Sequence, residues 1–409
     1  MKPFFRVMDI DDVLKLQTEF DVCGTEIVAL AAAEGRILAA TLAADVDIPG
    51  FARSTMDGYA VRAASTFGAS EGSPAFLKVV GKIGMGEHPT VEVGAGEAVR
   101  IATGGMLPRG ADAVVMVEHT EALDDTTIEA YKSVAPGQYV VEQGEDIRSG
   151  EALLEPGRPI RPQEAGLLAA IGAWKVTVFS RPKVGIISTG DEVVPVEQCP
   201  KAGQIRDINT TTLAALVSNA GGLAHTWDIV PDDFAQLHHT CRQALAASDM
   251  VLISGGSSVG TRDFTIEVIK ALDNAEILVH GVSIRPGKPT ILGRSGGKPI
   301  WGLPGHVTSA MVVFSVLVKP FLHRLAGRDP QFERRFALPA RLTRNLPSVQ
   351  GKVDFIRVRV SAGPDGWLAD PIMGKSGLIR TMVLADGLVR IDANTEGLDK
   401  DAPIMVDLF

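Results

Sequence analysis

Acidic side chains follow two apolar, strand-like stretches of this sequence, at points where glycine and serine break the apolar run. IISTGDEV (186–193) carries Asp191 and Glu192, and LISGGSSVGTRDFT (252–265) carries Asp263. Backbone N–H groups in glycine turns and at helix N-termini bind phosphate, but a carboxylate repels phosphate unless a cation lies between them. Carboxylate oxygens are hard ligands that suit Mg²⁺. The two stretches therefore predict a site for a phosphate that shares a magnesium ion.

Hydroxyl groups and glycines accompany the acid in the second stretch. Ser254, Ser257 and Ser258 are candidate donors to a phosphate, together with the backbone N–H groups of Gly255 and Gly256. Taken alone, a glycine-rich loop between a strand and a helix is usually only a turn. The loops match neither a Walker A nor a GxGxxG sequence.

Two further loops add positive charge and another helix start. SIRPGKPT (283–290) places Arg285 and Lys288 on a Pro-Gly turn, where a guanidinium fork and an ammonium group suit an oxyanion. GLPGHVTSA (302–310) joins a strand to a helix. Ligands of an open parallel sheet bind outside the carboxyl ends of its strands. Loops that follow strands are therefore expected to meet at one edge.

The elements that would position these loops alternate between strand and helix from residue 178 to 328. This alternation predicts an α/β domain with a mostly parallel sheet and helices on both faces. Strands are expected at KVGIIST, DMVLISGG, PTILG and PIWGLP, and helices at TTTLAALVSNAG, AQLHHTCRQALAAS, FTIEVIKALD and TSAMVVFSVLVKPFLHRLAG. The apolar run VTSAMVVFSVLV is too short to span a bilayer and predicts a buried helix.

The rest of the chain shows a different pattern of residue types. Residues 1–45 are rich in alanine and leucine and predict helix, as does RPQEAGLLAAIG. Short β-like runs between frequent glycines predict an inserted β domain, and KVDFIRVRV and MVLADGLVRID predict a small C-terminal one. The expected domains are a helical or extended linker domain (1–48 and 145–177), the inserted β domain (49–144), an α/β domain (178–328) and the C-terminal β domain (329–409).

Composition limits the class of protein. The chain has 409 residues, too many for one ordinary core, and its net charge of −9 argues against nucleic-acid binding. Its three cysteines, Cys23, Cys199 and Cys241, form no CxxC pair, which disfavours a zinc site and a disulfide framework. Acids near the N-terminus argue against a signal peptide. A reduced cytoplasm and no membrane partner are expected.

The β insert contributes three more polar candidates. Asp57 lies in STMDGYAV, Thr103 in RIATGG and Asp146 in GEDI. From the sequence alone a hairpin or a solvated turn is the favoured interpretation of each.

Seven stretches, in this order, resemble the characteristic stretches of the MoeA family of molybdopterin molybdenumtransferases, which includes the gephyrin E domain. They are STMDGYAV, RIATGGMLPRGADAVVM, GEDI, STGDE, SGGSSVGTRDFT, RPGKP and LPGHVTSA. The resemblance covers nearly the whole chain. It implies the last step of molybdenum-cofactor synthesis, in which molybdate is inserted into the dithiolene of adenylylated molybdopterin with Mg²⁺ and AMP is released.

The resemblance also implies an assembly and a set of partners. Members of the family are homodimers of four-domain subunits, with the site between the MogA-like α/β domain of one subunit and the insert and C-terminal domain of the other. A MogA-like adenylyltransferase and the target molybdoenzymes or tungstoenzymes are the implied protein partners.

Matching the motifs residue by residue carries over a set of site residues. The implied catalytic residues are Asp57, Thr103, Asp146, Asp191, Glu192 and Asp263, of which Asp191, Glu192 and Asp263 are the implied Mg²⁺ ligands. The implied residues around the substrate and the oxyanion are Ser254, Gly255, Gly256, Ser257, Ser258, Arg285, Lys288, Pro304, Ser309, Arg357 and Ser376.

The sequence departs from the family pattern beside the expected oxyanion site. His306-Val307 replaces the usual Asn-Pro, and Arg285 replaces a lysine. The stretch HGVSIRPGKPTILGR resembles a branch that includes tungsten-using organisms, so tungstate is an alternative metal oxyanion. A non-catalytic molybdopterin-binding scaffold is a second alternative, disfavoured because the acids are all present. A generic nucleotide phosphotransferase is disfavoured further, because the sequence offers no P-loop.

Overall fold

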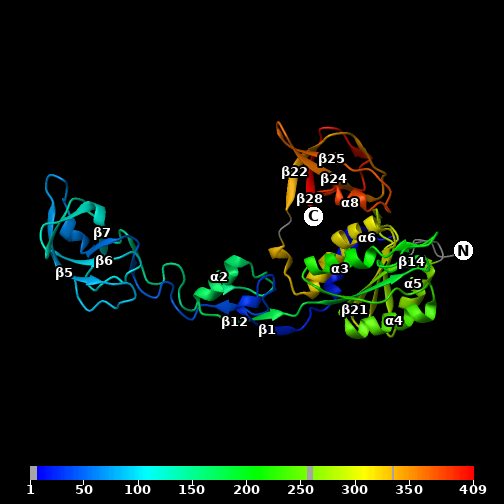
Figure 1. Ribbon diagram of the computed structural model, residues 1–409, viewed down its shortest axis with the longest axis horizontal. Coiled ribbons are helices and arrows are strands. Elements are labelled where there is room, and N and C mark those ends of the chain that lie inside the picture. The colour runs from blue at the N-terminus through cyan, green and yellow to red at the C-terminus, as the bar shows by residue number, and fades with distance from the viewer. Residues whose placement is uncertain (1–6, 256–260, 334–335) are drawn as a thin grey trace. The chain divides into compact units, whose positions relative to one another are not determined.

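The computed structural model describes residues 7–255, 261–333 and 336–409, with only the backbone of 261–263. The chain forms two compact units. The larger unit comprises Met1–Ala40, Pro156–Arg161 and Lys175–Phe409, and the smaller unit comprises Thr41–Glu155 and Pro162–Trp174. Each is described by itself below (Figure 1).

A mixed sheet forms the centre of the larger unit. Its strands follow the order β16 (Leu223–Thr226), β13 (Lys183–Thr189), β17 (Met250–Gly255), β21 (Lys298–Pro304), β20 (Ile291–Ser295) and β18 (Glu276–His280). β13, β17 and β21 are parallel neighbours, as expected, and β16 extends this parallel part of the sheet. β20 runs antiparallel to both β21 and β18, which the sequence did not indicate. β16 and β18 were not anticipated as strands.

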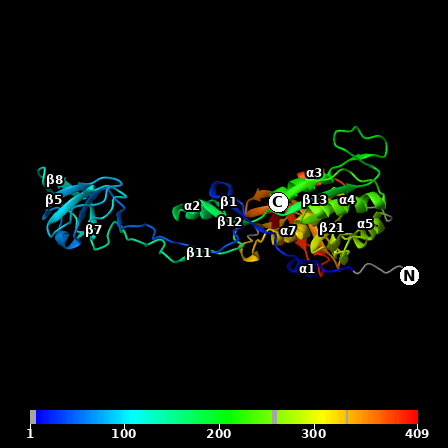
Figure 2. The same ribbon diagram turned by 90° about the horizontal axis from the view of Figure 1, so that it is seen from below.

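Helices cover both faces of this sheet, and the two-residue period of the strands decides which side chains meet which helix. Val184 and Leu252 face the core shared with α3 (Asn209–Asn219) and with the helix that begins at Val307. Ile187 and Ile253 face α4 (Phe234–Ala247) and α5 (Thr261–Lys270) on the other side. Figures 1 and 2 show this layering, and all four helices were expected.

The most apolar helix of the described chain lies inside the larger unit. It runs through α6 (Val307–Val313), a π-helical turn (Phe314–Val318) and α7 (Lys319–Leu325). At 19 residues it is long and apolar enough to cross a membrane, and longer than the apolar run that suggested it. Most of it is buried in the sheet core, with Phe321 packed 5.0 Å from the Trp301 ring and 5.6 Å from Phe20. It is the core helix that the sequence predicted.

The expectation of helix over residues 1–45 is largely wrong. Within the described residues 7–45, α1 (Ile10–Lys15) is the α-helical part, followed by a 3-10 turn (Leu16–Glu19). Thr25–Ala29, which leads into the alanine-rich stretch, forms β1 and pairs antiparallel with β12 (Lys175–Phe179), and the stretch itself contains a 3-10 turn (Leu30–Ala32). Helix propensity is a weak preference, and pairing with a distant strand overrides it.

The C-terminal segment closes into a β-barrel. Its strands are β22 (Ala337–Leu342), β24 (Val353–Gly363), β25 (Gly366–Pro371), β26 (Gly387–Ile391) and β28 (Pro403–Leu408), and β24 closes the barrel by pairing with β26. β19 (Ile284–Arg285), from the α/β segment, pairs parallel with β24. MVLADGLVRID is only partly strand, because Met382 and Val383 end the short helix α8 (Arg380–Val383).

The smaller unit is built on the expected β insert. Its main sheet follows the order β7 (Ala113–Met116), β4 (Gly58–Val61), β6 (Glu97–Ile101), β5 (Ala75–Ile83), β9 (Thr127–Ala130) and β8 (Thr120–Ala122). Val61, Leu77, Val115 and Ile128 fill its core. Gly58 is required at its position, because a Cβ there would lie 2.0 Å from the Val115 carbonyl oxygen. The expected helix in RPQEAGLLAAIG is α2 (Pro162–Ala170).

Short strand pairs complete the two units. In the smaller unit β3 (Arg53–Ser54) pairs with β10 (Val140–Val141), and β2 (Leu42–Ala43) with β11 (Ala152–Leu154). In the larger unit β14 (Val193–Val194) pairs with β15 (Ile205–Arg206), and β23 (Leu346–Pro347) with β27 (Gly397–Leu398).

Replacing Gly287 with alanine should destabilise the larger unit. Gly287 has φ +115°, and a Cβ there would lie 2.4 Å from Val313 Cγ2 and 3.0 Å from Ile284 Cδ1. We expect Gly287→Ala to lower the free energy of unfolding by about 2 to 4 kcal/mol, from backbone strain and overpacking together. Urea unfolding followed by tryptophan fluorescence measures it.

The matched control is Gly297→Ala, in the turn between β20 and β21. Gly297 also has a positive φ, +78°, but nothing lies within 4 Å of an added Cβ. Gly297→Ala should lower the free energy of unfolding by about 1 kcal/mol. An equal decrease in the free energy of unfolding in both variants would mean that the loop around Gly287 is not closely packed.

Candidate functional site

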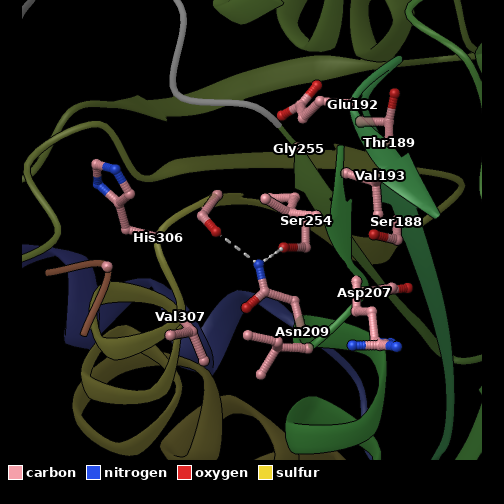
Figure 3. A pocket seen from close by; sticks show the side chains of 15 residues that line it. Ser188, Thr189, Glu192, Val193, Asp207, Asn209, Ser254, Gly255, His306 and Val307 are labelled. Atoms are coloured by element: carbon pink, nitrogen blue, oxygen red, sulfur yellow. Dashed lines mark hydrogen bonds between the residues drawn. The ribbon is translucent and has the colours of Figure 1, made fainter. Parts of the chain in front are cut away.

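The carboxyl ends of β13, β17 and β21 lie at one edge of the central sheet, as the parallel strands predicted. Residues at and after these ends line a cavity of about 220 Å³, which we call the sheet-edge cavity. Figure 3 shows its polar lining, which includes Ser188, Thr189, Glu192, Asp207, Asn209, Ser254 and His306.

Asn209, at the start of α3, joins the end of β17 to the segment after β21. Its side-chain Nδ2 donates to Ser254 Oγ (2.7 Å) and to the carbonyl oxygen of Gly305 (2.8 Å), as Figure 3 shows. Both contacts join segments far apart in the sequence, so sequence reasoning missed this residue. Asn209 fixes the end of β17 relative to Gly305.

Three carboxylates lie near the end of β13. The N–H of Asp232 donates to Asp191 Oδ1 (3.1 Å), and Thr189 Oγ1 donates to Asp232 Oδ1 (3.0 Å). Burial raises the pKa of Asp232, and the negative charges of Asp191 and Glu192 raise it further, against the opposite effect of the Thr189 bond. Mutual repulsion of this kind favours a cation between the carboxylates. Asp232 lies in none of the motifs, and the sequence analysis did not identify it as a site residue.

The third expected magnesium ligand cannot be placed by its side chain. Asp263 lies in α5, where only the backbone is described, and Gly256, Ser257 and Ser258 lie outside the described residues. Among the side chains that are described, no group of three or more His, Cys, Asp or Glu residues is arranged to hold a metal ion. The hard oxygen donors Asp191 and Glu192 nevertheless fit Mg²⁺ by their chemistry.

A second, larger cavity of about 700 Å³ lies where the α/β segment meets the C-terminal barrel. We call it the basic cavity. It brings together every residue that the resemblance assigned to the oxyanion: Arg285, Lys288, Pro304, Ser309, Arg357 and Ser376.

The reversed strand β20 explains how the basic loop reaches this place. Ile291, where β20 begins, pairs with Gly302 near the end of β21. The loop before β20, with Arg285 and Lys288, therefore lies at the same sheet edge as the loops after the parallel strands. A parallel β20 would have placed it at the opposite edge.

Arg285 is already paired within the protein. β19 and β24 place Arg285 opposite Asp354, and the Arg285 Nη2 group donates a short hydrogen bond to Asp354 Oδ2. Ser348 Oγ donates to the same oxygen. The Arg285 side chain is 45% exposed and that of Asp354 only 1%. Asp354, which the sequence did not indicate, thus orients the guanidinium and leaves part of it toward the cavity.

The barrel side of the basic cavity is held by specific hydrogen bonds. Arg357 donates from Nη1 to Thr381 Oγ1 (2.8 Å) and from Nη2 to the Gly374 carbonyl (3.0 Å), and burial lowers its pKa from the ordinary value. Ser376 Oγ lies 3.0 Å from His306 Nδ1. The positions of Arg357 and Ser376 are thereby fixed.

The remaining expected residues lie in the smaller unit. Asp57 Oδ1 accepts hydrogen bonds from the Thr103 N–H (2.7 Å) and from its hydroxyl (3.0 Å), and these bonds lower the pKa of Asp57. The two residues form one exposed constellation rather than two separate turns. Asp146 is exposed, and its N–H donates to the Ile48 carbonyl oxygen (3.1 Å).

Models of known families match three consecutive parts of the chain. Residues 8–172 match the MoeA N-terminal region (domain I and II), residues 185–324 a probable molybdopterin binding domain, and residues 339–409 the MoeA C-terminal region (domain IV).

Known relatives are similar over nearly their full length. A putative molybdopterin biosynthesis protein of Methanocaldococcus jannaschii is 37% identical, covering 93% of this chain and 91% of its own. The molybdopterin molybdenumtransferase of Bacillus subtilis is 31% identical, covering 98% of this chain and 94% of its own. A crystal structure of the molybdopterin biosynthesis MoeA protein from Pyrococcus horikoshii is 40% identical, covering 98% of this chain and 99% of its own, with a TM-score of 0.82.

The order of the three matched regions agrees with the order of the structural segments, from the insert through the α/β segment to the barrel. The similarity to relatives extends over both units and both cavities. On this evidence the chain belongs to the MoeA family of molybdopterin molybdenumtransferases, which act in molybdenum-cofactor biosynthesis.

Proposed function

We propose that this chain inserts molybdate into adenylylated molybdopterin in a Mg²⁺-dependent reaction that releases AMP. The observation that carries the proposal is the adjacency of two unlike cavities, one with acids and phosphate-type loops and one with arginine and lysine. A substrate with a phosphate at one end and a dithiolene near an oxyanion needs both.

Each cavity has a distinct part in this proposal. Asp191, Glu192 and Asp263 would hold Mg²⁺, which when bound supplies positive charge to the phosphate oxygens. The N–H groups of the SGG loop and Ser254 would orient the phosphate. Arg285, Lys288 and Arg357 would neutralise the oxyanion, with Ser309 and Ser376 as hydrogen-bond donors. Catalysis would come mainly from positioning and charge stabilisation.

Asp57, Thr103 and Asp146 would complete the site from a second subunit. They lie in the smaller unit, and the family resemblance pairs that insert with the α/β domain of the partner in a homodimer. The lowered pKa of Asp57 supports an ionised carboxylate there. The proposed setting is the cytoplasm, with a MogA-like adenylyltransferase supplying the substrate and molybdoenzymes or tungstoenzymes receiving the product.

Tungstate is the second candidate oxyanion. It has the same tetrahedral form and charge as molybdate, and the observation that favours it is the stretch HGVSIRPGKPTILGR, which resembles a branch that includes tungsten-using organisms. Competition of the two oxyanions for the basic cavity, measured by calorimetry, decides between them. A scaffold function is disfavoured by the ordered contacts of Asp57, Asp191 and Asp232.

Removing the charge of Asp263 should abolish most of the magnesium-dependent reaction. We expect Asp263→Asn to slow AMP release from adenylylated molybdopterin by about 100-fold or more, because a metal ligand supplies several kcal/mol to the transition state. AMP is quantified by chromatography with molybdate and Mg²⁺ present. The control is Asp273→Asn, an exposed carboxylate beyond α5 that should leave the rate unchanged. A fully active Asp263→Asn protein would contradict the role in metal binding.

Removing the Lys288 ammonium group should weaken oxyanion use without stopping phosphate chemistry. We expect Lys288→Ala to raise the KM for molybdate by about 10-fold or more, since a charge-assisted hydrogen bond is lost. Steady-state assays with varied molybdate measure this. Lys270→Ala removes an exposed lysine at the end of α5 and serves as the control. An unchanged KM in Lys288→Ala would exclude this residue from the oxyanion site.

Neutralising Asp354 should loosen Arg285. We expect Asp354→Asn to raise the KM for molybdate, and to lower the free energy of unfolding by about 1 to 2 kcal/mol, a modest value because Arg285 is partly solvated. Unfolding curves and molybdate-dependent kinetics test the two effects. The exposed Asp365→Asn, in the turn between β24 and β25, is the control. Loss of stability with an unchanged KM would mean that the pair is purely structural.

A further inference from the structure

His306 stands between the two cavities. It is the N-cap residue of α6, and among the described lining residues it is common to the sheet-edge cavity and the basic cavity. Figure 3 shows its ring across the sheet-edge cavity from Thr189 and Glu192. A change in this side chain therefore acts on both cavities at once.

Three contacts from His306 and Thr308, at the start of α6, hold Ser376 in place. The Ser376 carbonyl oxygen accepts hydrogen bonds from the N–H of Thr308 (3.1 Å) and from the Thr308 hydroxyl. Ser376 Oγ lies 3.0 Å from His306 Nδ1. With the backbone and Oγ fixed, the direction of the hydroxyl proton is the remaining freedom of this side chain.

The tautomer and the charge of the imidazole decide that direction, and the Nε2-protonated tautomer makes it depend on charge. A neutral ring with its proton on Nε2 has an acceptor at Nδ1, so the Ser376 hydroxyl donates to the ring and turns its lone pairs outward. When the ring takes a proton at Nδ1, it donates to Ser376 Oγ instead. The hydroxyl proton must then point elsewhere and can be donated to an anion in the basic cavity.

We propose that His306 is a positioning residue, which directs the Ser376 hydroxyl toward the oxyanion when its ring is protonated and away when it is neutral. The proposal rests on the proposed function only in taking the ligand to be a tetrahedral oxyanion. Asparagine, which the family resemblance places at this position, does not titrate and would give no such dependence on pH.

The charged groups around His306 come from several elements. They are Glu192, Arg206 and Asp207 at the sheet-edge cavity, Arg285, Lys288, Lys352 and Arg357 at the basic cavity, and Lys375 next to Ser376. Of the residue types represented, only histidine ordinarily changes its charge between pH 5 and 8. Protonation of the oxyanion itself would affect every variant alike, so a dependence on pH that is lost when His306 is replaced points to His306.

The test measures binding of molybdate alone, and of tungstate alone, by calorimetry at about pH 5.5 and about pH 8. The full-length proteins are the wild type, His306→Asn, Ser376→Ala and His239→Asn, the last removing an exposed histidine on α4. We expect the wild type and His239→Asn to bind about 3- to 10-fold more tightly at the lower pH, the gain of one hydrogen bond. His306→Asn and Ser376→Ala should show no such change.

Each other outcome overturns the proposal. If His306→Asn shows the same pH dependence of oxyanion binding, another group causes that dependence. If Ser376→Ala shows it, the Ser376 hydroxyl does not mediate the effect of pH on binding. A wild type that binds neither anion, or binds both equally at the two pH values, also contradicts it. Thermal denaturation confirms that the variants are folded. AMP release, assayed separately at pH 8, tests the proposed function, so the two can fail independently.

Discussion

The pairing of β19 with β24 is the contact on which the basic cavity depends. It joins a two-residue strand of the α/β segment to the barrel, and its register sets Arg285 opposite Asp354. The carboxylate of Asp354 is buried, so its charge requires a partner, and Arg285 with Ser348 supplies it. The same interaction orients the guanidinium and docks the barrel. One ion pair therefore links the docking of the barrel to the position of the Arg285 side chain in the basic cavity.

The sheet-edge cavity follows a different constraint. Parallel strands bring their carboxyl ends to one edge, but they do not fix the segments at that edge relative to one another. Asn209 does this with two hydrogen bonds, and Asp232 does it for the TGDE turn through its N–H. Neither contact is local in sequence. The bonds of Asn209 are buried or partly buried, where an unpaired polar group would be costly, whereas the bond between Asp232 and Asp191 is exposed.

The fold was predictable where local patterns are strong. The helices of the α/β segment, four of its strands and the β insert are all present, because hydrophobic periodicity marks them. The helix expected over residues 1–45 was largely wrong, since a weak preference for helix is overridden by the pairing of β1 with β12 and of β2 with β11. The reversal of β20 was also missed. No local feature reports strand direction, which is set by the short return from β20 to β21.

The sequence by itself determined the family and the chemical types at the site: acids after two strands, glycine and serine loops, and a basic Pro-Gly turn. These follow from residue identity and order along the chain. Only the tertiary structure decided that Arg285 is paired with Asp354, that Asp232 lies beside Asp191, and that His306 borders both cavities. Such contacts join residues far apart along the chain, and their geometry depends on strand register and domain docking, which no local pattern encodes.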